Sequence, residues 1–219
     1  MRKRVALIGC CLLFAAALPC LADEGTRHYR EVHGQSSAIV DYGTEKTDTG
    51  YRVSAIGADS TEIVQWLPAS GVVSWHLKDA IKKFDLVATR SGDTIIVKGA
   101  QGGKDIAREI RVDQAPWYQI FGPVIDQLLP GVQGQREFWV VNPDDLSAHK
   151  MQARRAGTER IDIRGTAVDT IKVHFSPAGA LAPFWGADYW FRATDTVYVY
   201  SRLPENGGLT VTTIEEPLR

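Results

Sequence analysis

The side chains that could carry catalysis in this chain are its histidines, serines and acids, and their spacing sets the first limits. The five histidines are His28, His33, His76, His149 and His174. A zinc site needs several converging ligands, often closely spaced along the chain. His28 and His33 lie five residues apart, which places them on opposite faces of a strand. His76 and His174 fall on polar strand positions, so we expect surface histidines and no metal site.

Other catalytic patterns are also missing from the sequence. No Gly-x-Ser-x-Gly string marks a hydrolase nucleophile. The run 99–104 resembles a phosphate-binding loop, but its spacing is one residue short and Asp105 follows the lysine, which favours a hairpin turn. The adjacent acids Asp144 and Asp145 are typical of a solvated turn rather than of a glycosidase pair. We therefore expect no enzyme activity, no catalytic residue and no cofactor.

Aromatic side chains are the most informative group in the sequence. They lie on or beside expected strands, and the run 184–191 is the densest cluster. Aromatic residues bury large apolar areas, so ordinary core packing explains them. The second interpretation, after core packing, is that they line an apolar ligand cleft, which needs a concave apolar surface with few polar groups. In this second interpretation the ligand-binding wall is formed by Trp75, Trp139, Tyr189 and Trp190.

The N-terminus has the pattern of an export signal. Arg2, Lys3 and Arg4 precede an uncharged apolar run over residues 5–18, and Ala22 precedes an acidic pair. This order is typical of a secretory signal peptide, and the run is shorter than the roughly 20 residues of a transmembrane helix. We predict cleavage after Ala22, a periplasmic location and no later transmembrane segment. The alternatives are an uncleaved anchor and a lipid anchor at Cys10, since Leu7-Ile8-Gly9-Cys10 has the form of a lipid-attachment box, although the apolar run before it is short.

Cleavage at this site changes both the cysteine content and the charge. All three cysteines, Cys10, Cys11 and Cys20, lie inside residues 1–22, so the mature chain can form no disulfide. It keeps 22 basic and 26 acidic residues, a net charge of −4. The charges are scattered, whereas nucleic-acid binding needs a basic stripe. We expect no nucleic-acid partner and one β-rich domain over residues 23–219.

Alternating polar and apolar residues run through most of this domain. Val73, Trp75 and Leu77, for example, alternate with polar neighbours. This period of two predicts strands with one buried face, and the intervening Gly, Pro, Asn and Asp clusters predict turns. The expected strands are 28–33, 37–45, 51–58, 61–67, 71–78, 83–90, 93–99, 104–112, 134–142, 148–156, 159–164, 168–175, 187–193, 196–203 and 208–215.

One segment breaks this alternation. Between Asp113 and Gly131 the apolar residues recur at helical spacing, Pro116 suits a first turn, and Gly122-Pro123 would cause a kink. We therefore predict a kinked helix over 116–129 that packs against the sheet. The expected fold is mainly β, a long curved antiparallel sheet or incomplete barrel, with this helical segment in its concavity.

The C-terminal region carries a family resemblance. The strand Ile-Lys-Val-His-Phe (171–175) is followed by the aromatic run 185–191, by Asp195 and by Tyr198-Val199-Tyr200. This order resembles an uncharacterised bacterial exported family, domain of unknown function 3108. That family is in turn similar to the LolA/LolB-like lipoprotein-carrier fold, in which an incomplete barrel wraps around helices. The resemblance implies that the domain shelters a lipid-like ligand.

Two functions follow from these patterns. The first is an envelope protein that binds a lipid-like or other apolar ligand between the sheet and the helix. The second is a non-catalytic scaffold, or an interaction protein of an envelope complex, because the edges of an antiparallel sheet can accept a strand from a partner.

Overall fold

Fourteen strands make up most of the described structure. The computed structural model describes residues 25–68, 70–120, 135–205 and 208–217. The strands are β1 (Gly25–His33), β2 (Ser36–Lys46), β3 (Tyr51–Ile56), β4 (Ser60–Leu67), β5 (Gly71–Asp79), β6 (Phe84–Ser91), β7 (Thr94–Gln101), β8 (Lys104–Arg111), β9 (Gln135–Val141), β10 (Ala148–Ile163), β11 (Thr166–Pro177), β12 (Ala187–Arg192), β13 (Tyr198–Glu205) and β14 (Gly208–Ile214). A short 3-10 helix covers Gly179–Phe184.

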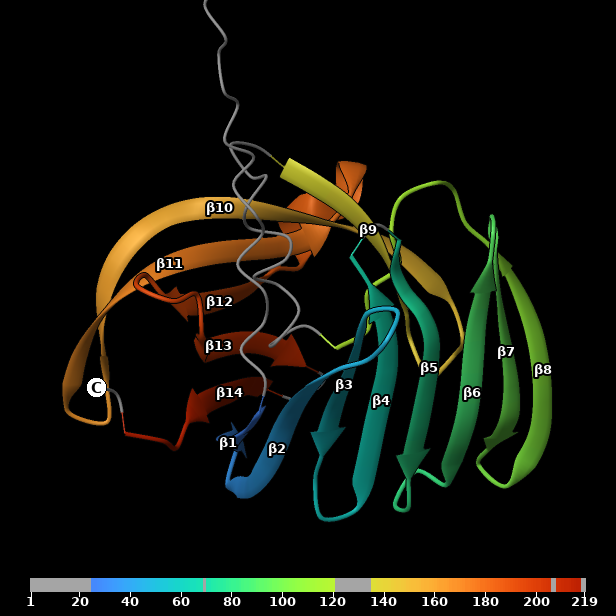
Figure 1. The fold of residues 1–219 in the computed structure, drawn as a ribbon, viewed down its shortest axis with the longest axis horizontal. Coiled ribbons are helices and arrows are strands. Elements are labelled where there is room, and N and C mark those ends of the chain that lie inside the picture. The colour runs from blue at the N-terminus through green and yellow to red at the C-terminus, as the bar shows by residue number, and fades with distance from the viewer. Residues whose placement is uncertain (1–24, 69, 121–134, 206–207, 218–219) are drawn as a thin grey trace, which may run out of the picture.

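These strands form one antiparallel sheet in the order β8-β7-β6-β5-β4-β3-β2-β1-β14-β13-β12-β11-β10-β9. Two runs of consecutive neighbours, β1–β8 and β9–β14, are joined where β1 pairs with β14. The sheet curves strongly, and the long strands β10 and β11 arch across the top of the view (Figure 1). The predicted antiparallel, mainly β architecture is therefore confirmed.

Alternation explains why these segments are strands. In β6 the side chains of Leu86 and Ala88 are buried, whereas Asp85, Val87 and Thr89 between them are exposed. One face of each such strand therefore contributes to the core and the other faces water.

The predicted strand positions match the structure closely, except that two predicted strands form one continuous strand. The predicted pair 148–156 and 159–164 is a single strand, β10, which passes a bulge between Arg155 and Gly157. The run 99–104 forms a hairpin turn as predicted, with Gln101 paired to Lys104 and Gly102-Gly103 at positive φ. Glycine reaches such φ values without steric cost.

The predicted helix over 116–129 is wrong where the structure describes it. Residues 116–120 are extended, and Trp117 forms parallel bridges with Gly71 and Trp139. Residues 121–129 lie outside the described residues. Among the residues described, the 3-10 turn at 179–184 is the only helix, and no described helix is long and apolar enough to cross a membrane.

Tertiary hydrogen bonds account for the extended conformation. The Trp117 carbonyl accepts from the Val72 amide at 2.8 Å, and the Pro116 carbonyl accepts from the Trp139 amide at 2.8 Å. The buried side-chain amide of Gln119 donates to the Val141 carbonyl and accepts from the Val141 backbone N–H. It therefore makes the two hydrogen bonds that a backbone peptide group would make in a strand pair. Residues 117–120 are all buried, not only those of one helical face. The apolar residues are therefore covered without a helix.

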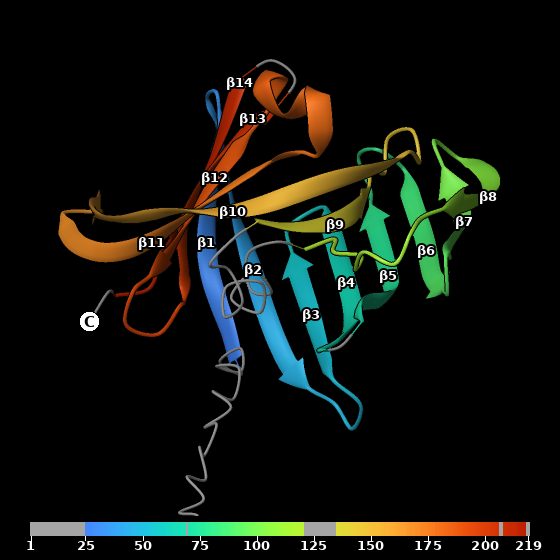
Figure 2. The same cartoon turned by 90° about the horizontal axis from the view of Figure 1, so that it is seen from above.

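This segment also changes the shape of the sheet. Residues 116–118 lie between the start of β5 and strand β9, which stand far apart in the strand order. The part of the sheet from β5 to β9 therefore closes on itself through this segment, while β6, β7 and β8 continue beyond β5 (Figures 1 and 2). The result is an interior bounded by the concave face of the sheet (Figures 1 and 2).

A continuous line of aromatic rings fills one side of this interior. Successive ring centroids lie 4.9–5.9 Å apart. Most of these pairs meet edge to face, the geometry that aromatic quadrupoles favour. The members, in order, are Tyr42, Tyr29, Tyr198, Tyr189, Phe175, Phe138 and Tyr118. Aromatic side chains from β1, β2, β9, β11, β12 and β13 thus pack together inside the curved sheet.

Candidate functional site

The four predicted wall residues lie in three separate places. Trp75 is buried in β5, where its ring meets the edge of Trp117 and its Nε1 donates to Glu62 Oε1 at 2.7 Å. Trp139 in β9 is half-buried and donates through Nε1 to Asp113 Oδ1 at 2.8 Å. These two residues help to hold the 113–118 segment in place.

Tyr189 and Trp190 are neighbours on β12 that point to opposite faces. Tyr189 belongs to the line of aromatic rings inside the sheet. Trp190 packs against Tyr200, lies under the Lys172 ammonium group and donates to Glu159 Oε1. The structure thus does not bring the four predicted side chains into one wall.

The histidines mostly pair with acids or hydroxyl groups near the surface. His28 contacts Asp41 at 2.6 Å, and His76 contacts Asp85 at 3.0 Å. His174 contacts Asp188 at 2.7 Å. Within the described ranges, no group of three or more His, Cys, Asp or Glu side chains is placed to hold a metal ion.

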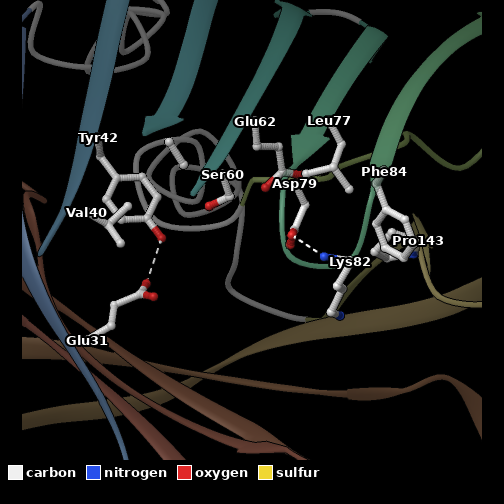
Figure 3. Close-up of a pocket in the computed structure, with 11 residues that line it drawn as sticks. Glu31, Val40, Tyr42, Ser60, Glu62, Leu77, Asp79, Lys82, Phe84 and Pro143 are labelled. Carbon is white, nitrogen blue, oxygen red and sulfur yellow. Dashed lines mark hydrogen bonds between the residues drawn. The ribbon is translucent and has the colours of Figure 1, made fainter. Parts of the chain in front are cut away.

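A cavity of about 270 Å³ lies against the concave face of β1–β6. Val40 in β2, Leu77 in β5 and Phe84 in β6 form apolar walls of the cavity (Figure 3). Ala55 in β3 also lines it. Pro143, from the turn after β9, lines it too. The cavity is therefore assembled by consecutive strands of the first run and by one turn of the second.

Carboxyl groups form the polar part of this cavity. Glu31, Glu62 and Asp79 line it together with Tyr42 and Ser60. Figure 3 shows Glu31 pointing at the Tyr42 hydroxyl, which donates to Glu31 Oε1 at 3.3 Å. Asp79 Oδ1 accepts from the Lys82 backbone amide at 2.8 Å. The cavity thus combines an apolar wall with an acidic one.

The protonation of Glu62 is strongly affected by its surroundings. Burial disfavours the charged form and raises the pKa of Glu62 to about 7, although the hydrogen bond from Trp75 opposes this shift. Burial also raises the pKa of Glu31, against the hydrogen bonds from Tyr42 and Thr212. Among the described residues, neither carboxyl group forms an ion pair with a basic side chain, so their charges are poorly compensated.

The rim of the cavity is tied to the turn after β9. Lys82 Nζ donates to Asp144 Oδ1 at 2.8 Å and lies over the Phe84 ring. Gln101 Nε2 donates to the carbonyls of Pro143 and Asp144 at 2.8 and 2.7 Å. Asp144 and Asp145 are exposed turn residues, as predicted. These contacts hold Pro143 over the cavity.

The sequence contains a signal for the acidic wall that is not one of the catalytic motifs considered above. Glu62 shares its strand face with the buried residues Val64 and Trp66, and Glu31 shares its face with the buried Tyr29. A carboxyl group on the apolar face of an alternating strand is buried on folding, which is unfavourable without a partner, so such a residue is a candidate functional residue. That pattern would have marked both residues.

Similarity to solved structures extends over most of the chain. The structure resembles a crystal structure from Brucella abortus, a beta-barrel-like protein of domain of unknown function DUF1849. The TM-score is 0.59 at 8% sequence identity, and the match covers 87% of this chain and 95% of that one. At such low identity the match shows the shared fold alone.

Two further matches are weaker. The hypothetical lipoprotein YmcC from Escherichia coli matches with a TM-score of 0.38 and 10% identity, over 89% of this chain and 84% of that one. LprF from Mycobacterium bovis matches with a TM-score of 0.31 and 14% identity, over 89% and 87%. No protein-family model and no curated protein matches the sequence. Membership of the 3108 family is therefore not shown.

Proposed function

We propose that this is an exported envelope protein that binds an apolar or amphipathic ligand in the concave cavity, without catalysing a reaction. The cavity itself carries this proposal. Its volume of about 270 Å³ lies just under the roughly 300–1,000 Å³ typical of small-molecule sites. Of its eleven lining residues five are apolar and six are polar or charged, a composition that suits an amphipathic ligand better than a purely apolar one.

The binding site differs in place from the one predicted. It lies between the first six strands and the turn at Pro143, rather than between the sheet and a helix. The signal pattern of residues 1–22 supports a periplasmic location. The DUF1849 likeness is compatible with this function but names no ligand.

Filling the cavity tests the proposal. Ala55→Phe adds a ring to the apolar wall and should abolish binding of an apolar fluorescent probe, while Ala107→Phe on the exposed part of β8 should leave it unchanged. Native mass spectrometry of the protein purified from its own envelope should show a bound small molecule. Absence of ligand together with an equal probe response in both variants would exclude the proposal.

A second function is favoured by the edge of the sheet. Within the described residues β8 pairs only with β7, so its outer edge presents unpaired backbone groups that could accept a partner strand. The edge carries charged residues such as Lys104 and Arg108, which discourage non-specific pairing. A pull-down returning one stoichiometric envelope protein, lost on substituting Ala107→Pro in β8, would support this scaffold function.

A further inference from the structure

We propose that the cavity selects an organic cation, an alkylammonium or similar group attached to a short apolar body. The inference rests on the proposed function and names its ligand class. It follows from the charges in the cavity, from their burial and from the apolar wall beside them.

The charges that line the cavity do not balance. Three carboxyl groups, Glu31, Glu62 and Asp79, face a single basic residue, Lys82. The Lys82 ammonium group already pairs with Asp144, which does not line the cavity. In the part of the chain that the structure describes, no basic side chain lies within ion-pair distance of Glu31 or Glu62. Above about pH 7, where Glu62 loses its proton, the cavity therefore presents negative charge that none of these basic side chains compensates.

Burial makes uncompensated negative charge in the cavity energetically unfavourable. A carboxylate removed from water is unfavourable unless a positive charge or several hydrogen-bond donors replace its hydration. Among the described side chains Trp75 Nε1 donates to Glu62, and burial raises the pKa of Glu62 although this hydrogen bond opposes the shift. An ammonium group between Glu31 and Glu62 would supply up to three donors and the opposite charge.

The remaining walls suit the apolar part of such a ligand. Val40, Ala55 and Leu77 offer aliphatic surface, and the Phe84 ring already lies 5.7 Å from one ammonium group, Lys82 Nζ. Aromatic faces attract cations through their quadrupoles. A purely anionic ligand, by contrast, would meet Glu31 and Glu62 and be repelled. The cavity thus distinguishes ligands by the sign of their charge.

Matched ligands with the same chain test this selectivity. Octylammonium chloride and 1-octanol should be compared by calorimetric titration at pH 8, where Glu62 is ionised and an alkylammonium, like lysine, keeps its proton. We expect octylammonium to bind about tenfold more tightly than 1-octanol, the effect of one charge-assisted contact. Glu62→Gln or Glu31→Gln should remove most of this preference, measured as the ratio of the two affinities.

Controls separate the possible outcomes. Glu109→Gln removes the same charge from the exposed part of β8 and should preserve the preference. If Glu109→Gln lowers the preference for octylammonium as much as Glu62→Gln does, non-specific attraction of the cation to the negatively charged protein explains the preference. The inference is then wrong. Equal affinity of the parent for both ligands overturns the cation selectivity but keeps the proposed function. Failure of both ligands to bind argues against the proposed function itself.

Discussion

Glu62 occupies a position at which β4 otherwise carries apolar side chains. It lies on the same face as Val64 and Trp66, and its burial raises its pKa to about 7. The unfolded chain releases this proton near the ordinary value of 4.5. Between these two values the folded state binds more protons than the unfolded state. Stability should therefore fall as pH rises from about 4.5 to about 7.

Replacing Glu62 by glutamine should remove this pH dependence. Taken in full, the rise of the pKa from 4.5 to about 7 would correspond to about 3 kcal/mol of folding stability. Because the side chain is partly exposed, solvent screening reduces the expected effect to about 1–2 kcal/mol. Glu62→Gln should thus be more stable than the parent at pH 8 by that amount and nearly equal at pH 4.5. Urea denaturation at both pH values measures the difference. A constant offset at both pH values would contradict the shifted pKa.

The segment from Pro116 to Tyr118 is the element that closes the curved sheet. It needs a close backbone approach at the start of β5, where Gly71 has φ of +78°. A Cβ atom built there would lie 2.6 Å from the Trp117 carbonyl oxygen. Only glycine allows both the backbone angle and the hydrogen bond from Val72 to Trp117.

Gly71→Ala should therefore destabilise the protein more than the same substitution at another glycine that has the same φ but no close neighbour. Gly103 also has φ of +78°, but an added Cβ there meets nothing within 4 Å, so Gly103→Ala reports backbone strain alone. We expect Gly103→Ala to cost about 1 kcal/mol and Gly71→Ala at least about 2 kcal/mol more. Thermal denaturation of both variants measures this. Equal losses of stability in the two variants would show that the steric contact with Trp117 contributes nothing to the effect of Gly71→Ala.

At the scale of the whole molecule, the two strand runs depend on each other. Pairing of β1 with β14 joins them on one side, and residues 116–118 join β5 to β9 on the other. The cavity needs both runs, because its strands come from the first and Pro143 from the second. Ligand binding should therefore be lost whenever this closure is lost.

Export, which the N-terminal pattern predicts, also concerns the whole chain. The mature protein should begin at Asp23 and contain no cysteine, because the signal pattern ends at Ala22. Intact-mass measurement of the protein from a periplasmic fraction should give the mass of residues 23–219 and no reaction with thiol reagents. Ala22→Asp should block cleavage and leave the longer form. A parent protein that keeps residues 1–22 would support the uncleaved anchor instead.

The sequence by itself determined the strands, the turns and the sidedness of the sheet. Alternation placed residues such as Leu86 and Ala88 on the buried face, and glycine-rich turns marked the hairpins. These features are local, since the strand period and turn chemistry involve only neighbouring residues. They fix which face is buried but not which strands meet.

Tertiary structure alone decided the closure and the cavity. The spacing of apolar residues after Pro116 suits a helix, yet backbone hydrogen bonds to Val72 and Trp139 hold the described residues extended. Glu31 and Glu62 stand on strands separated by two others in the sheet, and only its curvature places both beside one space. The physical reason is that hydrogen bonds and burial between distant segments outweigh local preference, and local periodicity carries no record of distant partners.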